Sequence, residues 1–180
     1  MTVWFYSDPH YNHDKIIEYC NRPFNSVEEM NEALVANYNN LVDVKDTVYV
    51  LGDFAMSKPE LFTKKLNGNK FLIRGNHDEP FKNKFASSWG FGWVKDVYEL
   101  VVDKQHIWLS HYSHQTWPGK HRGAWHLFGH SHGKLPGLGL STDVGVDCWN
   151  YAPVSFEQLQ ILFAEKAKTL INTLEPKRDM

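Results

Sequence analysis

Short runs of β-branched and aromatic residues recur along the chain without the 3.6-residue period of a helix. Such runs are typical of β-strands, and the pattern predicts strands at residues 3–7, 47–51, 70–73, 97–102, 106–110, 125–129 and 144–147. The polar stretch 103–105 separates two of these runs and predicts a hairpin turn, although it lacks the usual glycine.

Apolar residues at helical spacing separate the early strands and follow the last one. Two of these segments begin with a Ser that is followed three residues later by Glu or Gln, which is the pattern of a helix N-terminal capping box. The spacing predicts helices over residues 26–41, 59–66, 80–89 and 155–174.

Strands and helices therefore alternate in the first half of the chain, and strands crowd the second half before a final helix. This order predicts an α/β (α+β) fold, built either on one mixed sheet or on a pair of packed sheets with flanking helices. The 180 residues contain no internal repeat, low-complexity tract or linker, so we expect a single domain over residues 1–180.

Charge and cysteine content exclude some classes of protein. The 19 Lys and Arg against 21 Asp and Glu argue against a sequence-independent nucleic-acid coat, which needs a basic surface, although a local basic patch stays compatible. Cys20 and Cys148 have no metal-like spacing, and we expect two buried thiols rather than a disulfide. The first residues do not resemble a signal peptide and no apolar run is long enough to span a bilayer, so we expect a cytoplasmic protein without a membrane partner.

Side chains that bind metals follow five of the predicted strands. They are Asp8 and His10, Asp53, Asn76 with His77 and Asp78, His111, and finally His130 and His132. The carboxyl ends of strands in such sheets meet at one rim, so we expect these groups to converge. The Asp8/His10 and His130/His132 pairs are each two residues apart, and an extended backbone would point both members the same way. Glycines beside them, at 52, 75, 129 and 133, permit close approach of the backbone.

The chemistry of this set indicates two transition-metal ions. Each short motif alone is common in ordinary loops, but five of them at strand ends in one short chain are not. Asp, His and Asn together favour a borderline divalent ion over Ca²⁺ or Mg²⁺, which take mainly oxygen ligands. The groups are too many for one tetrahedral ion, whereas two ions bridged by a carboxylate would use them all.

The order of these motifs resembles that of the calcineurin-like metallophosphoesterases. The chain reads DPH at 8–10, GD at 52–53, GNHD at 75–78, SH at 110–111 and GHSH at 129–132. The resemblance covers about residues 3 to 155 and is strongest to compact, single-domain prokaryotic or phage members. It implies two packed mixed β-sheets flanked by helices.

The resemblance also implies roles for the residues that match. Asp8, His10, Asp53 and His132 would hold one metal, Asp53 would bridge, and Asn76, His111 and His130 would complete the second. Mn²⁺ is the expected ion, with Fe, Zn²⁺ and Ni²⁺ as alternatives. His77 would be the catalytic residue that faces the substrate and protonates the leaving oxygen. Asp78 would either orient His77 or only cap the following helix.

The implied reaction is hydrolysis of a small phosphodiester or nucleotide by activated hydroxide. The alternatives are a phosphomonoesterase, a nuclease-type phosphodiesterase on nucleic-acid ends, and, from a different class, an inert metal-bound binding module. Arg22 and Arg122 are candidates for binding the phosphate, although each is equally compatible with a loop charge, and Asn12 is a further candidate. The oligomeric state is left open.

Overall fold

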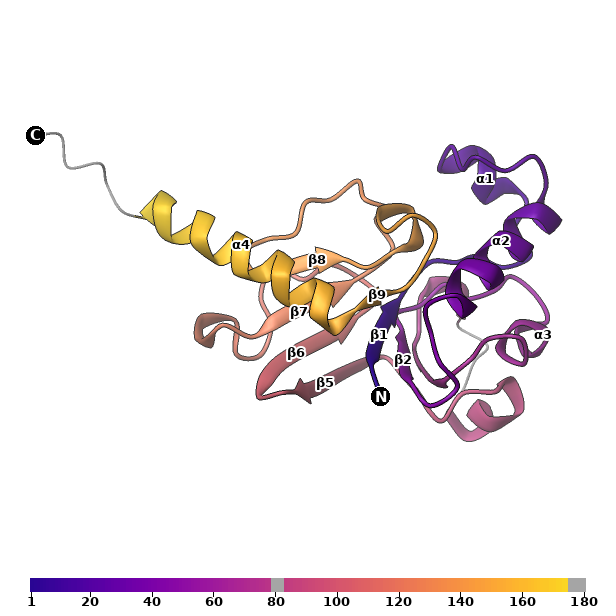
Figure 1. Cartoon of the computed structure of the whole chain (residues 1–180), viewed down its shortest axis with the longest axis horizontal. Coiled ribbons are helices and arrows are strands. Elements are labelled where there is room, and N and C mark those ends of the chain that lie inside the picture. The colour runs from indigo at the N-terminus through magenta and orange to yellow at the C-terminus, as the bar shows by residue number, and fades with distance from the viewer. Residues whose placement is uncertain (79–82, 175–180) are drawn as a thin grey trace, which may run out of the picture.

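The computed structural model describes residues 1–78 and 83–174, and it contains two mixed β-sheets with flanking helices (Figure 1). The first sheet has the order β4-β3-β2-β1-β9. Its strands are β1 (Val3–Tyr6), β2 (Thr47–Val50), β3 (Asn69–Ile73), β4 (Val94–Lys95) and β9 (Val154–Ser155). The first four run parallel, and β9 is antiparallel to β1.

The second sheet has the order β5-β6-β7-β8. Its strands are β5 (Val97–Val102), β6 (Gln105–Ser110), β7 (Trp125–Phe128) and β8 (Ser141–Asp143). β5 and β6 form an antiparallel hairpin, whereas β6, β7 and β8 run parallel. The pair of packed mixed sheets confirms the fold class predicted from the sequence.

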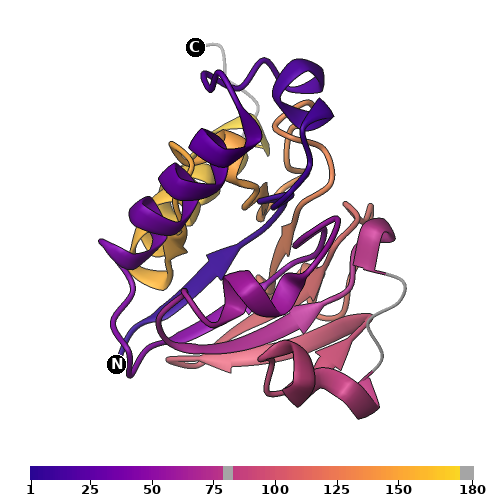
Figure 2. The same cartoon turned by 90° about the vertical axis from the view of Figure 1, so that its right-hand side faces the viewer.

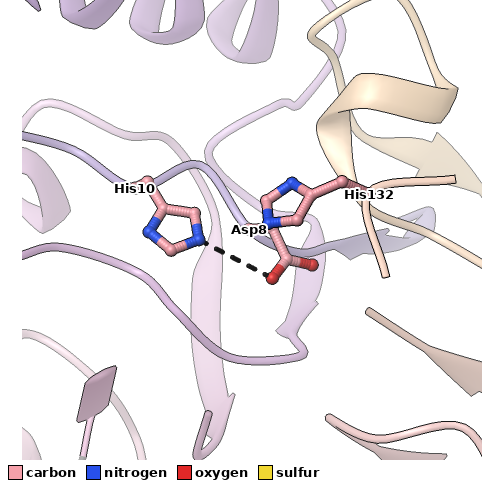
Figure 3. Close-up of side chains that lie close together, drawn as sticks. All are labelled: Asp8, His10 and His132. Carbon is pink, nitrogen blue, oxygen red and sulfur yellow. Dashed lines mark ion pairs between the residues drawn. The ribbon is translucent and has the colours of Figure 1, made fainter. Parts of the chain in front are cut away.

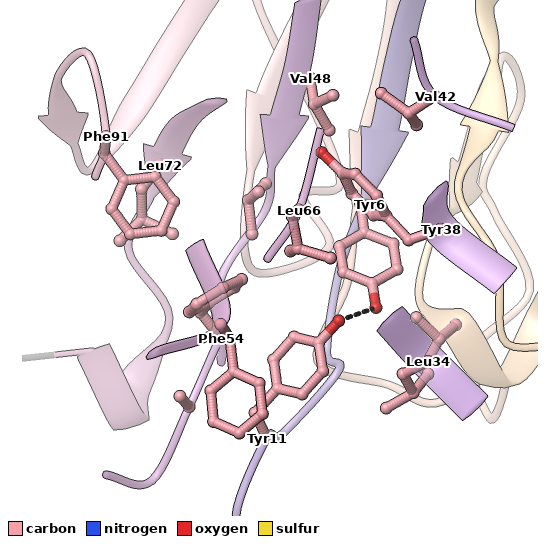
Figure 4. Packing of buried hydrophobic residues seen from close by; sticks show 14 of the residues in the cluster. Tyr6, Tyr11, Leu34, Tyr38, Val42, Val48, Phe54, Leu66, Leu72 and Phe91 are labelled. Carbon is pink, nitrogen blue, oxygen red and sulfur yellow. Dashed lines mark hydrogen bonds between the residues drawn. The ribbon is translucent and has the colours of Figure 1, made fainter. Parts of the chain in front are cut away.

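Alternation along β1 divides the hydrophobic core into two layers. Tyr6 faces α2 (Val27–Asn39) and α3 (Pro59–Thr63), where it packs with residues such as Leu34 and Phe54 (Figure 4). Phe5 points to the opposite face and packs in a second layer with residues of β6 and β7. The first sheet is therefore buried on both faces, which explains why its strands are almost continuously apolar.

Helix α4 (Phe156–Leu174) closes the second layer and extends past the sheets (Figure 1). Phe163 of this helix packs on Trp125 of β7, with ring centroids 4.5 Å apart. The helices α1 (Lys15–Tyr19) and α2 lie on the other side of the first sheet, where Ile16 and Leu34 pack in the same cluster as Tyr6. Figure 2, which views the molecule from that side, shows α2 in front of α4. Four 3₁₀ helices complete the described elements: η1 (Asn76–Asp78), η2 (Asn83–Trp89), η3 (Lys120–Arg122) and η4 (Val146–Cys148).

The local signals for helix starts and for the hairpin are confirmed. The Ser26 hydroxyl accepts a hydrogen bond from the Glu29 backbone N–H at 3.1 Å. Ser155 and Gln158 cap each other reciprocally, at 2.9 and 3.2 Å. The hairpin turn has φ of 47° at Asp103 and 69° at Lys104, so two positive φ angles stand where glycine was expected.

Several predicted boundaries are wrong. The strand predicted over 144–147 is β8 at 141–143 followed by η4, because the Asp143 side chain accepts from Gly145 N–H at 2.7 Å and turns the chain. The helix predicted over 59–66 ends at Thr63, and that over 26–41 ends at Asn39, which leaves Leu41 exposed. Of the helix predicted over 80–89, residues 80–82 lie outside the described residues, and the rest is 3₁₀.

The shortest helices and strands were not predicted from the sequence pattern. α1, β4 and β9 were not predicted, because stretches of two to five residues show no measurable period. Both thiols are free, as expected, but Cys148 is exposed and Cys20 only partly buried, so the prediction of two buried thiols is wrong. None of the helices in the described ranges combines the length and the apolar character needed to cross a bilayer.

Candidate metal centre

The carboxyl ends of β1, β2, β3, β6 and β7 meet at one rim, where hydrogen bonds join the two sheets. The His111 ring donates from Nδ1 to the Leu51 carbonyl at 2.7 Å, and Val146 N–H donates to the Ser7 carbonyl at 2.9 Å. The convergence expected for parallel strands is therefore present, and it brings the seven predicted ligand residues to one place.

These residues form two groups around Asp53. We call Asp8, His10 and His132 the deep cluster, because Asp8 is fully buried and His10 is 2 % exposed. We call Asn76, His111 and His130 the open cluster, because Asn76 and His130 are exposed. Potential ligand atoms of the deep cluster lie within 4.8 Å of one another, and so do those of Asp53, His111 and His130. Figure 3 shows Asp8 and His10 arriving from one segment of the chain and His132 from another.

Asp53 lies between the two clusters. Its Oδ1 accepts a hydrogen bond from the His77 backbone N–H at 2.9 Å. Its Oδ2 lies 3.5 Å from His10 Nε2 and 3.6 Å from His111 Nε2. Oδ2 therefore faces a histidine of each cluster, which is the position that a bridging carboxylate oxygen requires.

The backbone of the ligand loops is left-handed rather than extended. The φ angles are 56° at Asp8, 51° at His10, 64° at His130 and 48° at His132. The prediction that an extended backbone points both members of each pair the same way is therefore wrong. Positive φ in non-glycine residues costs about 1–3 kcal/mol and is concentrated at functional sites, so this rim holds strained backbone on several loops.

Two glycines lie directly behind the ligand residues. A Cβ on Gly75 would lie 2.2 Å from Asp53 Oδ1, and one on Gly129 would lie 2.3 Å from Asp8 Oδ2. No side chain larger than hydrogen fits at these two positions, as the sequence motifs suggested.

The ring nitrogens that face away from the rim are tied to partners. Because a carbonyl and a carboxylate only accept, His111 donates from Nδ1 to Leu51, and His132 donates from Nδ1 to Asp147 at 2.7 Å. His10 Nδ1 lies 3.2 Å from His13 Nδ1. Each arrangement leaves Nε2 directed toward the cluster, which is the usual support for a metal-binding imidazole.

The deep cluster contains buried polar atoms that lack protein partners. Among the residues that the structure describes, neither Asp8 Oδ1 nor His10 Nε2 has a hydrogen-bond partner. Burial raises the pKa of Asp8 to about 8 and strongly lowers the pKa of His10. A divalent cation would stabilise the Asp8 carboxylate and occupy the His10 lone pair, so it would satisfy both atoms at once. The residues present therefore fit a metal ion.

His77 stands at the mouth of the centre. Its side chain is 37 % exposed, and its Nε2 lies 3.9 Å from Asp53 Oδ2. Its ring packs edge-on against the ring of His10, with centroids 5.4 Å apart. Its backbone is anchored on Asp53 while its ring remains accessible, which is the placement expected of a group that meets a substrate.

Asp78 supports the backbone of the Asp53 loop. Its carboxylate accepts from the N–H groups of Asp53 at 2.6 Å, Gly75 at 2.9 Å and Phe54 at 3.0 Å. Burial nevertheless raises the pKa of Asp78 to about 6. These bonds go to backbone N–H groups rather than to the His77 ring, and the start of the helix that Asp78 was predicted to cap, at residues 80–82, lies outside the described residues.

The residues suggested for binding substrate are engaged elsewhere or lie far from the rim. The buried Arg22 guanidinium forms a two-point ion pair with Asp147, at 2.8 Å in both contacts. The Asn12 amide is hydrogen-bonded with Asn31 at 2.9 Å and with the Ser57 carbonyl at 3.2 Å. Arg122 precedes β7 and so lies at its amino end, opposite the end that carries His130. The structure therefore brings none of the three to the centre with a free polar group.

Two buried carboxylates near the centre were missed by sequence reasoning. Asp143 accepts from Ser131 Oγ and from Gly133 N–H, at 3.0 Å for the latter, so it shapes the loop that carries His130 and His132. Asp147 receives the His132 ring and Arg22. The only signal available was the pair of aspartates in the segment 143–147, of which the strand predicted over 144–147 included Asp147.

A cleft of about 640 Å³ adjoins the open cluster. Asn76 and His111 of the open cluster are among its lining residues, together with Arg74, Tyr112 and Val97. The Tyr112 ring is exposed and packs edge-on against the His130 ring, with centroids 4.7 Å apart. The cleft therefore borders the side of the centre where His130 and Asn76 are exposed.

Comparison with known proteins identifies the family. The family model of calcineurin-like phosphoesterases matches residues 1–149, which contain all the metal-binding motifs. The chain belongs to this family. It is accordingly a metal-dependent phosphoester hydrolase, and the resemblance inferred from the five motifs is confirmed.

Two curated proteins and one solved structure show how far the similarity extends. An uncharacterized protein of Methanocaldococcus jannaschii is 36 % identical over 180 residues, covering 93 % of this chain and 94 % of its own. The gene 66 protein of Mycobacterium phage L5 is 35 % identical over 85 residues, covering 44 % of this chain and 41 % of its own. A protein of unknown function from Aquifex aeolicus shares the fold, with a TM-score of 0.72 at 23 % identity over 89 % of this chain and 98 % of its own.

Proposed function

We propose that this metallophosphoesterase is a phosphodiesterase that hydrolyses a small phosphodiester or nucleotide at a two-ion centre. The observation that carries the proposal is the position of Asp53 Oδ2, which lies within 3.6 Å of a histidine Nε2 of each cluster. Ions held by the two clusters, with Mn²⁺ the expected metal, would supply Lewis-acid polarisation of the phosphoryl oxygens and a water of lowered pKa.

Residues of the chain supply the proton for the leaving oxygen and hold the carboxylate that lies between the two clusters. Water displaces one ester oxygen from phosphorus, which leaves a phosphomonoester and an alcohol. His77 donates the proton that the leaving oxygen requires, because its ring is accessible at the mouth while its backbone is held by Asp53. The hydrogen bond that Asp53 Oδ1 accepts from the His77 backbone N–H orients the carboxylate, so that Oδ2 faces both clusters.

The preference for a diester rests on the cleft beside the open cluster. A phosphomonoester has one organic group, whereas a diester has two that must be accommodated when the phosphorus lies at the centre. The cleft of about 640 Å³ is lined in part by Asn76 and His111 and is large enough to take the second group. The exposed ring of Tyr112 in its wall suits a planar group such as a nucleobase.

The test is a pair of assays on protein stripped of metal and reloaded with Mn²⁺. The substrates are bis-p-nitrophenyl phosphate and p-nitrophenyl phosphate, and the variants are His77→Ala and, as a matched control, the exposed His121→Ala. We expect preference for the diester. We expect His77→Ala to bind metal normally and to lose about 100- to 10,000-fold in kcat with a poor leaving group, as removal of a general acid does.

The outcomes separate the candidate functions. Preference for the monoester would indicate a phosphatase, and two bound ions without turnover would indicate a binding module. Unchanged turnover of a poor leaving group by His77→Ala would refute the proton-donor role and leave the metal centre unaffected.

A further inference from the structure

Arg22 connects the two chain segments that build the deep cluster. Its guanidinium donates to the backbone carbonyls of Asp8 at 2.8 Å and Pro9 at 3.0 Å. It also donates to both oxygens of Asp147 at 2.8 Å. The Arg22 side chain is fully buried and that of Asp147 is 9 % exposed, so the ion pair is shielded from solvent and its geometry is held by four hydrogen bonds.

Asp147, held in place by Arg22, in turn fixes the orientation of the His132 ring. Its Oδ2 accepts from His132 Nδ1 at 2.7 Å as well as from Arg22. A carboxylate only accepts, so the bond requires a hydrogen on Nδ1 and leaves Nε2 as the atom available to a metal. Arg22 in turn prevents Asp147 from rotating, because it holds both carboxylate oxygens.

We propose that Arg22 and Asp147 are positioning residues that orient His132 and hold it against the Asp8 loop, so that the deep cluster is assembled before an ion binds. The inference rests on the proposed two-ion function but concerns the affinity for one ion rather than the choice of substrate. Support of this kind is typically worth about 10- to 100-fold in metal affinity.

A competing interpretation is a third metal site. Cys20, His132 and Asp147 also offer ligand atoms within 4.8 Å of one another. However, both oxygens of Asp147 already accept from the Arg22 cation, and a second cation there would be repelled by the guanidinium. The contacts therefore favour a support for His132 over an additional site.

The experiment measures metal affinity and the state of the His132 ring. Metal-stripped wild type, Asp147→Asn, Asp147→Glu and Arg22→Lys are titrated with Zn²⁺ by calorimetry, and the low-field Nδ1–H signal of His132 is followed by NMR in the Zn²⁺-loaded forms. Asp46→Asn is the matched control. Asp46 is a buried carboxylate before β2, at the opposite rim, which accepts from Thr2 N–H at 2.7 Å and Trp4 Nε1–H at 3.0 Å.

We expect Asp147→Asn to lower the affinity for one of the two Zn²⁺ ions about 10- to 100-fold and to shift or remove the low-field Nδ1–H signal of His132. Asp147→Glu should lose less Zn²⁺ affinity than Asp147→Asn because it retains the negative charge. Arg22→Lys should also lose less Zn²⁺ affinity than Asp147→Asn, because the hydrogen bond between Asp147 and His132 remains. Asp46→Asn should lower the melting temperature without changing either affinity.

Unchanged affinity for both ions in a folded Asp147→Asn would overturn the inference. A wild-type Zn²⁺ form without a hydrogen-bonded Nδ1–H signal would also overturn it, even if the variant failed to fold. If the wild type binds two ions but does not hydrolyse esters, only the proposed function is overturned. The metal affinities of the variants would still test whether Arg22 and Asp147 position His132.

Discussion

The deep and open clusters share a rim and a carboxylate but differ in what surrounds them. Asp8 and His10 of the deep cluster are almost fully buried, and the side chains of His13 and Asp147 hold its two histidines. In the open cluster, His111 is buried against a backbone carbonyl, while Asn76 and His130 are exposed beside the cleft. The first arrangement suits retention of an ion, and the second suits contact with a substrate.

The variant with the largest expected effect removes the charge of the Asp53 carboxylate, which the deep and open clusters share. Asp53→Asn takes away the charge of the oxygen that faces both, so we expect loss of both ions and of turnover. Metal content after dialysis, measured by mass spectrometry, checks the prediction. Asp14→Asn, at an exposed carboxylate four residues after His10, should retain both ions. Full metal content in Asp53→Asn would contradict a bridging role.

A second test compares one histidine from each cluster. His10→Ala should abolish the tighter of the two metal-binding steps, because it removes a buried ligand from the deep cluster, whose other side chains are already oriented. His130→Ala should remove the weaker step and leave the tighter one within a few-fold of wild type. Calorimetric titration with Mn²⁺ distinguishes the two variants. Identical effects would show that burial does not make the clusters different.

The smallest expected effect concerns the cleft. Tyr112→Ala should raise KM for a nucleotide diester about 10-fold, as loss of one stacking contact does, and should leave KM for p-nitrophenyl phosphate nearly unchanged. Tyr112→Phe keeps the ring and removes only the hydroxyl, which lies 3.4 Å from Asn76 Oδ1, and it should behave as wild type. Equal changes in KM for both substrates would place the second ester group elsewhere.

The sequence anticipated the elements whose signals lie within a few residues. The capping pairs at Ser26 and Ser155 begin α2 and α4, and strands β1, β2 and β3 appear within one residue of their predicted limits. Local signals of this kind act through neighbouring hydrogen bonds, so they can be read without the fold. The very short strands β4 and β9 carry no such signal and form only because a partner strand is present.

Polar residues near the motifs were harder to interpret. Arg22 was predicted as a possible phosphate ligand, yet its guanidinium is buried against Asp147, which lies 125 residues away in the sequence. Asn12 pairs with Asn31, and Asp78 is directed to the backbone of Asp53 and Phe54. In each case the type of residue was compatible with a role in catalysis, and the hydrogen-bond partner that the structure shows for it is another part of the protein.

The sequence by itself determined the family, the order of the strands that lead to the rim, and the residue types that gather there. These properties are local, because a strand, the glycine after it and the ligand beside it occupy adjacent positions. Only the tertiary structure decided how the backbone turns at each ligand, which carboxylates support the loops, and which cluster is buried. Burial and long-range hydrogen bonds depend on segments that meet after folding, and no pattern within one segment specifies them.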